Sequence, residues 1–190
     1  MDLPSSPSID ALRVALDVPE GTLIGDHYRA IISRTQGMTH TVKFVTGPQP
    51  GTCIAFALGL SNNPVYQTIA LDFDGEVFAG RRFVEWMMRN RLKGVEPATV
   101  GSLVLYFLGI DWRHIGTADI LDRVVSQWGT FPVYEHGFFE VPQGYGDTVR
   151  FFDKPALEQS FADFLAYARS EGVSDKDIEA IIAQVKQRDS

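Results

Sequence analysis

Residues 47–60 read Gly-Pro-Gln-Pro-Gly-Thr-Cys-Ile-Ala-Phe-Ala-Leu-Gly-Leu, and this stretch decides the expected fold. Its first five residues form a glycine–proline cluster, which breaks regular structure. The run from Cys53 to Leu60 is apolar, and its alanines and leucines favour a helix over a strand. A helix that is apolar on nearly all sides belongs in a protein interior, so we expect a buried helix that begins at Cys53.

Composition limits what this cysteine can do. The chain has 190 residues, of which 45% are hydrophobic and 22% are charged, as in an ordinary globular protein. Because Cys53 is the only cysteine, the chain forms no internal disulfide and no zinc ribbon. The formal net charge of −7 argues against a nucleic-acid partner. A role for Cys53 beyond packing would therefore be chemical.

The sequence carries no recognisable targeting signal. Residues 1–7 lack the basic region and the apolar region of a signal peptide. No stretch approaches the ~18 apolar residues that a membrane span needs. We therefore expect no membrane span, and a protein that is either cytoplasmic or exported without a cleaved signal peptide.

Around the central helix, the hydrophobic pattern predicts an α+β domain with an antiparallel sheet. A hairpin is expected at Asp74-Gly75, between strands over 68–73 and 76–78. Residues 132–141 are expected to form an irregular aromatic loop. The other predicted strands cover 39–45, 102–108, 113–120, 122–128 and 147–152, and the other predicted helices cover 9–17, 23–35, 81–92 and two segments within 155–188.

Cys53 has the position that a cysteine nucleophile needs. The N-terminus of a helix carries partial positive charge and free N–H groups, which stabilise a thiolate and lower the thiol pKa. The same amides, including that of Cys53, are suited to hold an oxyanion. The alternative is that Cys53 is an inert thiol packed in the core.

His114 is the candidate base for this nucleophile. It follows the apolar strand predicted at 102–108, and only the fold brings it near Cys53. A third group would orient the imidazole through its second nitrogen, and Ser126, Gln127 and His136 are the candidates. The alternative is a strand histidine whose nitrogens are satisfied by backbone carbonyls.

These residues, in this order, resemble the NlpC-type branch of the papain-like cysteine hydrolases. More narrowly, residues 50–152 resemble a bacterial domain family with Asn-Cys-Ile-Ala-Trp-Ala-Leu-Gly and Ser-Lys-Trp-Gly motifs. The matching segments here are Cys53-Ile-Ala-Phe-Ala-Leu-Gly59, Val125-Ser-Gln-Trp-Gly129, His136 and Tyr145-Gly146. The chain departs from the family at Thr52, where asparagine or aspartate is usual, and at Gln127, where lysine is usual.

The resemblance implies a papain-like fold and a site. It implies that Cys53 is the nucleophile and His114 the base, with His136, Ser126 or Gln127 in the third role. It also implies Gln49 as a second oxyanion donor. The dense aromatic side chains Trp128, Tyr134 and Tyr145 are expected either to pack in the core or to line a substrate groove. Residues 1–7 are expected to be a disordered lead-in to one domain, 8–190, with N-terminal helices at 8–37, a catalytic-like core at 39–152 and a helical pair at 155–188.

The implied function is hydrolysis of an amide bond in a peptide, a cell-wall peptide or a protein side chain. We expect no cofactor and no metal, because a zinc site from Cys53, His114 and His136 would lack paired-ligand spacing. The resemblance also implies a bacterial effector or toxin, with a cognate inhibitor protein as partner. The alternatives are a catalytically silent binding or inhibitor module on the same fold, and a papain-like deamidase or acyltransferase.

Overall fold

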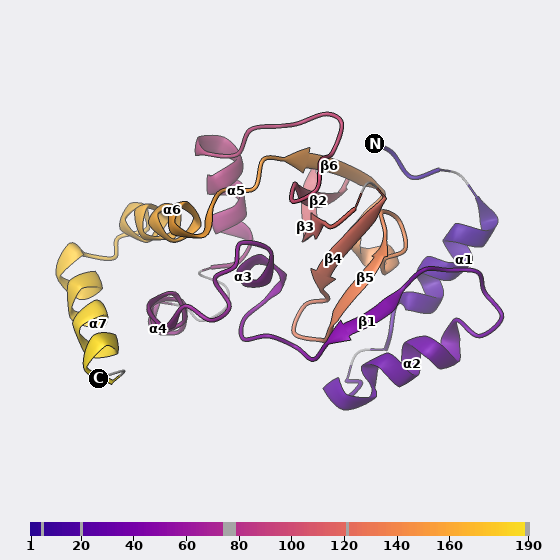
Figure 1. Ribbon diagram of the computed structural model, residues 1–190, viewed down its shortest axis with the longest axis horizontal. Coiled ribbons are helices and arrows are strands. Elements are labelled where there is room, and N and C mark those ends of the chain that lie inside the picture. Colours follow the sequence, from indigo (N-terminus) through magenta and orange to yellow (C-terminus); the bar gives the residue numbers. More distant parts are fainter. Residues whose placement is uncertain (5, 20, 74–78, 121, 189–190) are drawn as a thin grey trace.

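A computed structural model describes residues 1–190 apart from 5, 20, 74–78, 121 and 189–190. The described residues form seven α-helices and one six-stranded antiparallel sheet, with strand order β1-β5-β4-β3-β2-β6 (Figure 1). The predicted α+β class with an antiparallel sheet is therefore confirmed. The strands are β1 (Lys43–Thr46), β2 (Leu103–Leu108), β3 (Asp111–Ala118), β4 (Arg123–Gln127), β5 (Val133–Gly137) and β6 (Thr148–Phe152).

Helices cover both faces of the sheet, with α1 and α2 on one side and the remaining five on the other (Figure 1). The helices are α1 (Pro7–Leu16), α2 (His27–Arg34), α3 (Cys53–Ala57), α4 (Pro64–Asp72), α5 (Arg81–Asn90), α6 (Leu157–Ser170) and α7 (Asp175–Arg188), with 3₁₀ turns η1 (Ile24–Asp26) and η3 (Gln143–Tyr145). None of the helices within the described ranges has both the length and the apolar composition needed to cross a membrane.

Two hydrophobic cores lie on the two faces of the sheet. The first, here called the α3-side core, contains Cys53, Leu105 and Ile115 with residues of α4 to α7. The second, here called the α1-side core, contains Tyr106 and Trp128 with residues of α1 and α2. Because successive strand residues point to opposite faces, alternate residues of β2 belong to different cores.

The short helix α3 begins at the predicted residue. The hydroxyl of Thr52 accepts a hydrogen bond from the backbone N–H of Ile54 at 3.4 Å, which caps the helix. Within the helix only Phe56 is not fully buried, and the helix contacts β3 and β4. The predicted buried helix that begins at Cys53 is therefore confirmed.

Two segments differ from their predicted structure. Residues 68–72, predicted as a strand, belong to α4, because Asn63 caps this helix by accepting from Tyr66 N–H at 2.9 Å and Pro64 occupies its first turn. The predicted turn at 74–75 lies outside the described residues. Within the predicted aromatic loop, residues 133–137 form β5, which pairs with both β1 and β4. Pairing on two sides is a tertiary effect that local composition does not report.

The first residues of the chain pair with the sheet. Asp2 forms a bridge with Thr148, and the backbone N–H of Leu3 donates to the carbonyl of Asp147 at 2.7 Å. Gly94 forms a second bridge, with Phe152. The segment predicted as a disordered lead-in therefore covers part of the β6 edge, which would otherwise expose unpaired backbone groups.

Candidate functional site

Cys53 is the first residue of α3 and is buried against β3. Its side chain belongs to the α3-side core together with Ile115, and 8% of the residue is exposed. Burial raises the pKa of the Cys53 thiol to about 11, although backbone N–H groups, chiefly that of Ile115, partly offset this effect. Within the described part of the chain, no hydrogen bond joins the Cys53 sulfur to an imidazole.

His114 is the neighbour of Ile115 on β3, but its side chain lies on the opposite face of the sheet. Its ring packs 5.5 Å from that of Tyr106 and stacks on Tyr145 at 4.0 Å, between ring centroids. Burial, with a smaller effect of nearby His136, holds the pKa of His114 well below its ordinary value. The His114 Nε2 atom is buried and has no hydrogen-bond partner among the residues that the structure describes.

An irregularity in the pairing of β2 with β3 sets the direction of His114. Tyr106 is paired with His114, whereas Phe107 is paired with Trp112, so Arg113 is an extra residue on β3. Such a bulge re-aims the side chains that follow it. Trp112 accordingly lies in the α3-side core, while His114 contacts the α1-side core.

Ser126 and His136 form a buried pair with each other. The two atoms Ser126 Oγ and His136 Nε2 are 2.8 Å apart, and His136 Nδ1 lies 2.9 Å from the carbonyl of Gly137. The carbonyl only accepts, so Nδ1 carries the proton and Ser126 donates to Nε2. Burial lowers the pKa of His136 to about 4, so the imidazole is neutral. Neither residue hydrogen-bonds to His114 in this arrangement.

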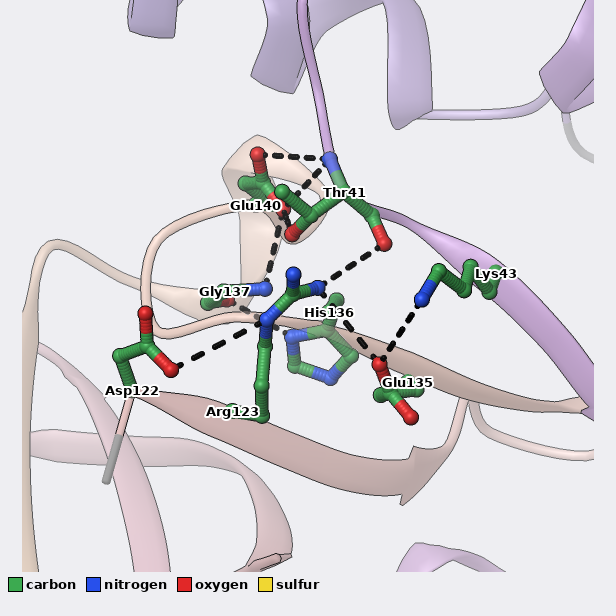
Figure 2. A network of polar contacts seen from close by, with 8 residues as sticks. All are labelled: Thr41, Lys43, Asp122, Arg123, Glu135, His136, Gly137 and Glu140. Carbon is green, nitrogen blue, oxygen red and sulfur yellow. Dashed lines mark hydrogen bonds and ion pairs between the residues drawn. The ribbon is translucent and has the colours of Figure 1, made fainter. Parts of the chain in front are cut away.

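A polar network lies beside His136 and joins it to the start of β1 (Figure 2). The Glu140 carboxylate accepts from the N–H groups of Thr41 at 3.0 Å and Gly137 at 2.9 Å, and also from the Thr41 hydroxyl. Arg123 donates to the Thr41 carbonyl at 3.2 Å. Because the Gly137 carbonyl is also the acceptor for His136 Nδ1, the network positions this side of the imidazole.

Gln127 holds the loop that leads into α3. Its Nε2 donates to the carbonyls of Gln49 at 3.1 Å, Gly51 at 3.0 Å and Gly129 at 3.1 Å, and its Oε1 accepts from Gln49 N–H at 3.1 Å. The side chain is fully buried. Gln127 therefore contacts the loop before Cys53 rather than an imidazole, a role that the sequence analysis missed. The glycine–proline composition of 47–51, which leaves many backbone groups in need of partners, is the signal for it.

The remaining predicted site residues have structural partners. Gln49 Nε2 donates to the carbonyl of Gly47 at 3.3 Å, within its own loop. Trp128 and Tyr134 are 1% and 0% exposed, and their rings pack 4.6 Å apart in the α1-side core. The structure thus places both in the core rather than on a groove wall, because β5 carries Tyr134 beneath α2.

Tyr145 is the residue that links His114 to Cys53. Its ring stacks on His114, and it is only partly buried as a residue. Burial raises the pKa of Tyr145 well above its ordinary value, and the nearby Cys53 adds to this effect. The described pairing between β3 and β4 is limited to the Thr117–Ala118 end of β3, so it does not extend to His114.

A pocket of about 200 Å³ opens beside the start of α3. Its walls come from the loop before Cys53, from α4 and from Ala79. The lining residues are Pro50, Gly51, Thr52, Tyr66, Gln67, Ala70, Leu71 and Ala79. The pocket is therefore mainly apolar and lies next to the candidate nucleophile.

Comparison of the chain with protein-family models, curated proteins and solved structures found no match. Among the residues that the structure describes, no three histidine, cysteine or acidic side chains are grouped as a metal site. The geometry of the site is therefore the basis for its chemistry.

Proposed function

We propose that the chain has a papain-like fold and hydrolyses an amide bond with a Cys53–His114 pair, and that the described conformation is its closed form. One observation carries the proposal. Cys53 opens the buried helix and packs against β3 at Ile115, directly beside His114 along the strand. The thiol at the start of a helix therefore lies one strand residue from a candidate base, whose imidazole must turn from the other face of the sheet to reach it.

In the open form, the His114 imidazole would turn toward the thiol and take its proton. The thiolate would attack the carbonyl carbon of an amide, and the N–H groups at the start of α3 would stabilise the resulting oxyanion. The protonated His114 would give its proton to the leaving amine, and water would then release the acyl group from sulfur. Ser126 and His136 would remain a supporting pair behind the site.

The pocket beside α3 supports a substrate with an apolar group next to the scissile amide. Its walls include Gly51 and Thr52, the two residues before Cys53, and the apolar side chains of Ala70 and Leu71. A peptide or a cell-wall peptide would supply such a group. An effector role with a cognate inhibitor protein rests on the sequence resemblance alone.

A second candidate function is a catalytically silent binding module on the same fold. The specific observation in its favour is the state of Cys53, whose pKa is raised to about 11 by burial. A thiol in that state is inert near neutral pH. Transfer or deamidation by the same pair would use the same residues as hydrolysis.

The pH dependence of Cys53 alkylation separates these candidates. The wild-type thiol reacts with iodoacetamide only as the thiolate of the open form, so the rate is low, and the pH midpoint is the pKa of the open thiol raised by the free energy of opening. We expect this midpoint to lie well below the value of about 11 for the closed thiol, and to rise in His114→Ala. His27→Ala is the matched control, because His27 is a buried histidine that bonds to Tyr134. A midpoint near 11 that is unchanged in His114→Ala would favour the silent module.

A further inference from the structure

A short segment covers His114 on the α1 side of the sheet. Residues 143–146, here called the strap, consist of η3 and Gly146 and lie against α1, β2 and β3. The strap carries Tyr145, whose ring stacks on His114 at 4.0 Å with an interplanar angle of 19°. The face of the imidazole is therefore occupied by a side chain of the same protein.

Arg13 of α1 holds the strap. The residue is 3% exposed, and its guanidinium donates to the carbonyls of Gln143, at 3.2 Å, and Gly146. Burial lowers the pKa of Arg13, with Asp147 as the largest opposing influence. A buried cation that donates to backbone carbonyls forms charge-assisted hydrogen bonds, which are stronger than neutral ones.

Gly146 seats the strap directly on β2. Its φ of +114° lies in the left-handed region that favours glycine, and a Cβ there would overlap the carbonyl of Phe107. The next residue, Asp147, donates its N–H to that same carbonyl at 2.9 Å. A side chain at position 146 would therefore lift the strap from the strand.

We propose that the strap is an autoinhibitory lid whose Tyr145 holds the His114 ring on the α1 side of the sheet, away from Cys53, and that Arg13 is its latch. The inference rests on the proposed function, because it names what regulates that site. Lifting the strap withdraws Tyr145, and the part of β3 around His114, which pairs with β2 but not with β4, can then turn the imidazole toward the thiol. Lids of this kind are short segments that open without unfolding of the whole protein.

The test measures whether His114 is accessible in the folded protein. Modification of His114 by diethyl pyrocarbonate is followed by mass spectrometry, well below the unfolding midpoint of each variant. Arg13→Gln and Tyr145→Ala are expected to raise the modification rate by about tenfold or more, since each removes a strong contact of the closed form. Tyr145→Phe, which retains the stacked ring, is expected to keep His114 protected. Gly146→Ala provides an independent way to unseat the strap.

Arg34→Gln is the matched control for a general loosening of α1. Arg34 donates to the α1 carbonyls of Ala15 at 2.8 Å and Val14 at 2.9 Å, but it forms no such bond with the strap. If Arg34→Gln raises the modification rate of His114 as much as Arg13→Gln does, Arg13 is not the latch. His114 that stays protected in Arg13→Gln, Tyr145→Ala and Gly146→Ala would overturn the lid. If His114 opens while the pH midpoint of Cys53 alkylation is the same in the wild type and in His114→Ala, the lid stands and the hydrolase proposal fails.

Discussion

At the residue scale, the site depends on one extra residue in β3. The pattern of the sequence places His114 on a strand beside the helix of Cys53, and both elements are present in the structure. Arg113, however, is an added residue opposite Tyr106 and Phe107, and the bulge turns His114 to the other face. A period-two pattern carries no sign of such a bulge, so the direction of His114 could not be predicted.

Gln127 illustrates a role that residue type alone does not reveal. We expect Gln127→Ala to lower the free energy of unfolding by about 2 kcal/mol, because it leaves one N–H and three carbonyls of the partly buried loops without their side-chain partner. Chemical denaturation measures the loss, and Gln36→Ala, at an exposed position after α2, is the control. A Gln127→Ala loss no larger than that of the control would contradict the assigned role.

The buried His136 predicts a loss of stability in acid. Its pKa is about 4 in the folded protein, against an ordinary value of 6.5. Between these values the unfolded chain binds more protons, so stability rises with pH across this window. The contribution of the neutral imidazole to the free energy of unfolding is about 3 kcal/mol. It is complete above pH 6.5 and is lost as the pH falls toward 4.

Denaturation curves between about pH 7 and pH 4 test this slope. The double variant Ser126→Ala, His136→Phe removes the titrating group together with its partner, and we expect a flatter pH dependence. His40→Asn, at a half-buried histidine outside this pair, serves as the control. Equal slopes in the wild type and the double variant would contradict a neutral, buried His136.

At the element scale, β5 and β1 depend on the network around Glu140 (Figure 2). We expect Glu140→Ala to lower the free energy of unfolding by about 2 kcal/mol, because the partly buried N–H groups of Thr41 and Gly137 lose their acceptor. Hydrogen exchange at these two amides should accelerate, while exchange in α6 should not change beyond the global loss of stability. Glu85→Ala, which removes an ion pair with Arg81 on α5 and lies outside the network, is the control. Unchanged protection at Thr41 would contradict the proposed role of the network.

The elements that the sequence predicted best are helices with a clear apolar stripe and a local capping residue. The two C-terminal helices follow clear apolar stripes, and Ser174 caps the second by accepting from Asp177 N–H at 3.2 Å. Residues 68–72 and 133–137 were mispredicted because their state depends on neighbours: the cap at Asn63 in one case and pairing on both sides in the other. The pairing of residues 1–3 with β6 is likewise a long-range contact.

At the scale of the whole molecule, the sheet separates the candidate nucleophile from its candidate base. Cys53 lies in the α3-side core, and His114 lies beneath Tyr145 on the α1 side. The N-terminal helix reaches His114 through Arg13 and the strap, so residues before the segment that resembles the papain-like hydrolases hold the described conformation. In the proposed hydrolase, the thiol is inert in this closed form.

The pH midpoint of Cys53 alkylation, compared between the wild type and His114→Ala, tests this account most directly. We predict a wild-type midpoint well below the value of about 11 for the closed thiol, and a higher midpoint when the imidazole is removed. A midpoint that is the same in both proteins would contradict the proposal.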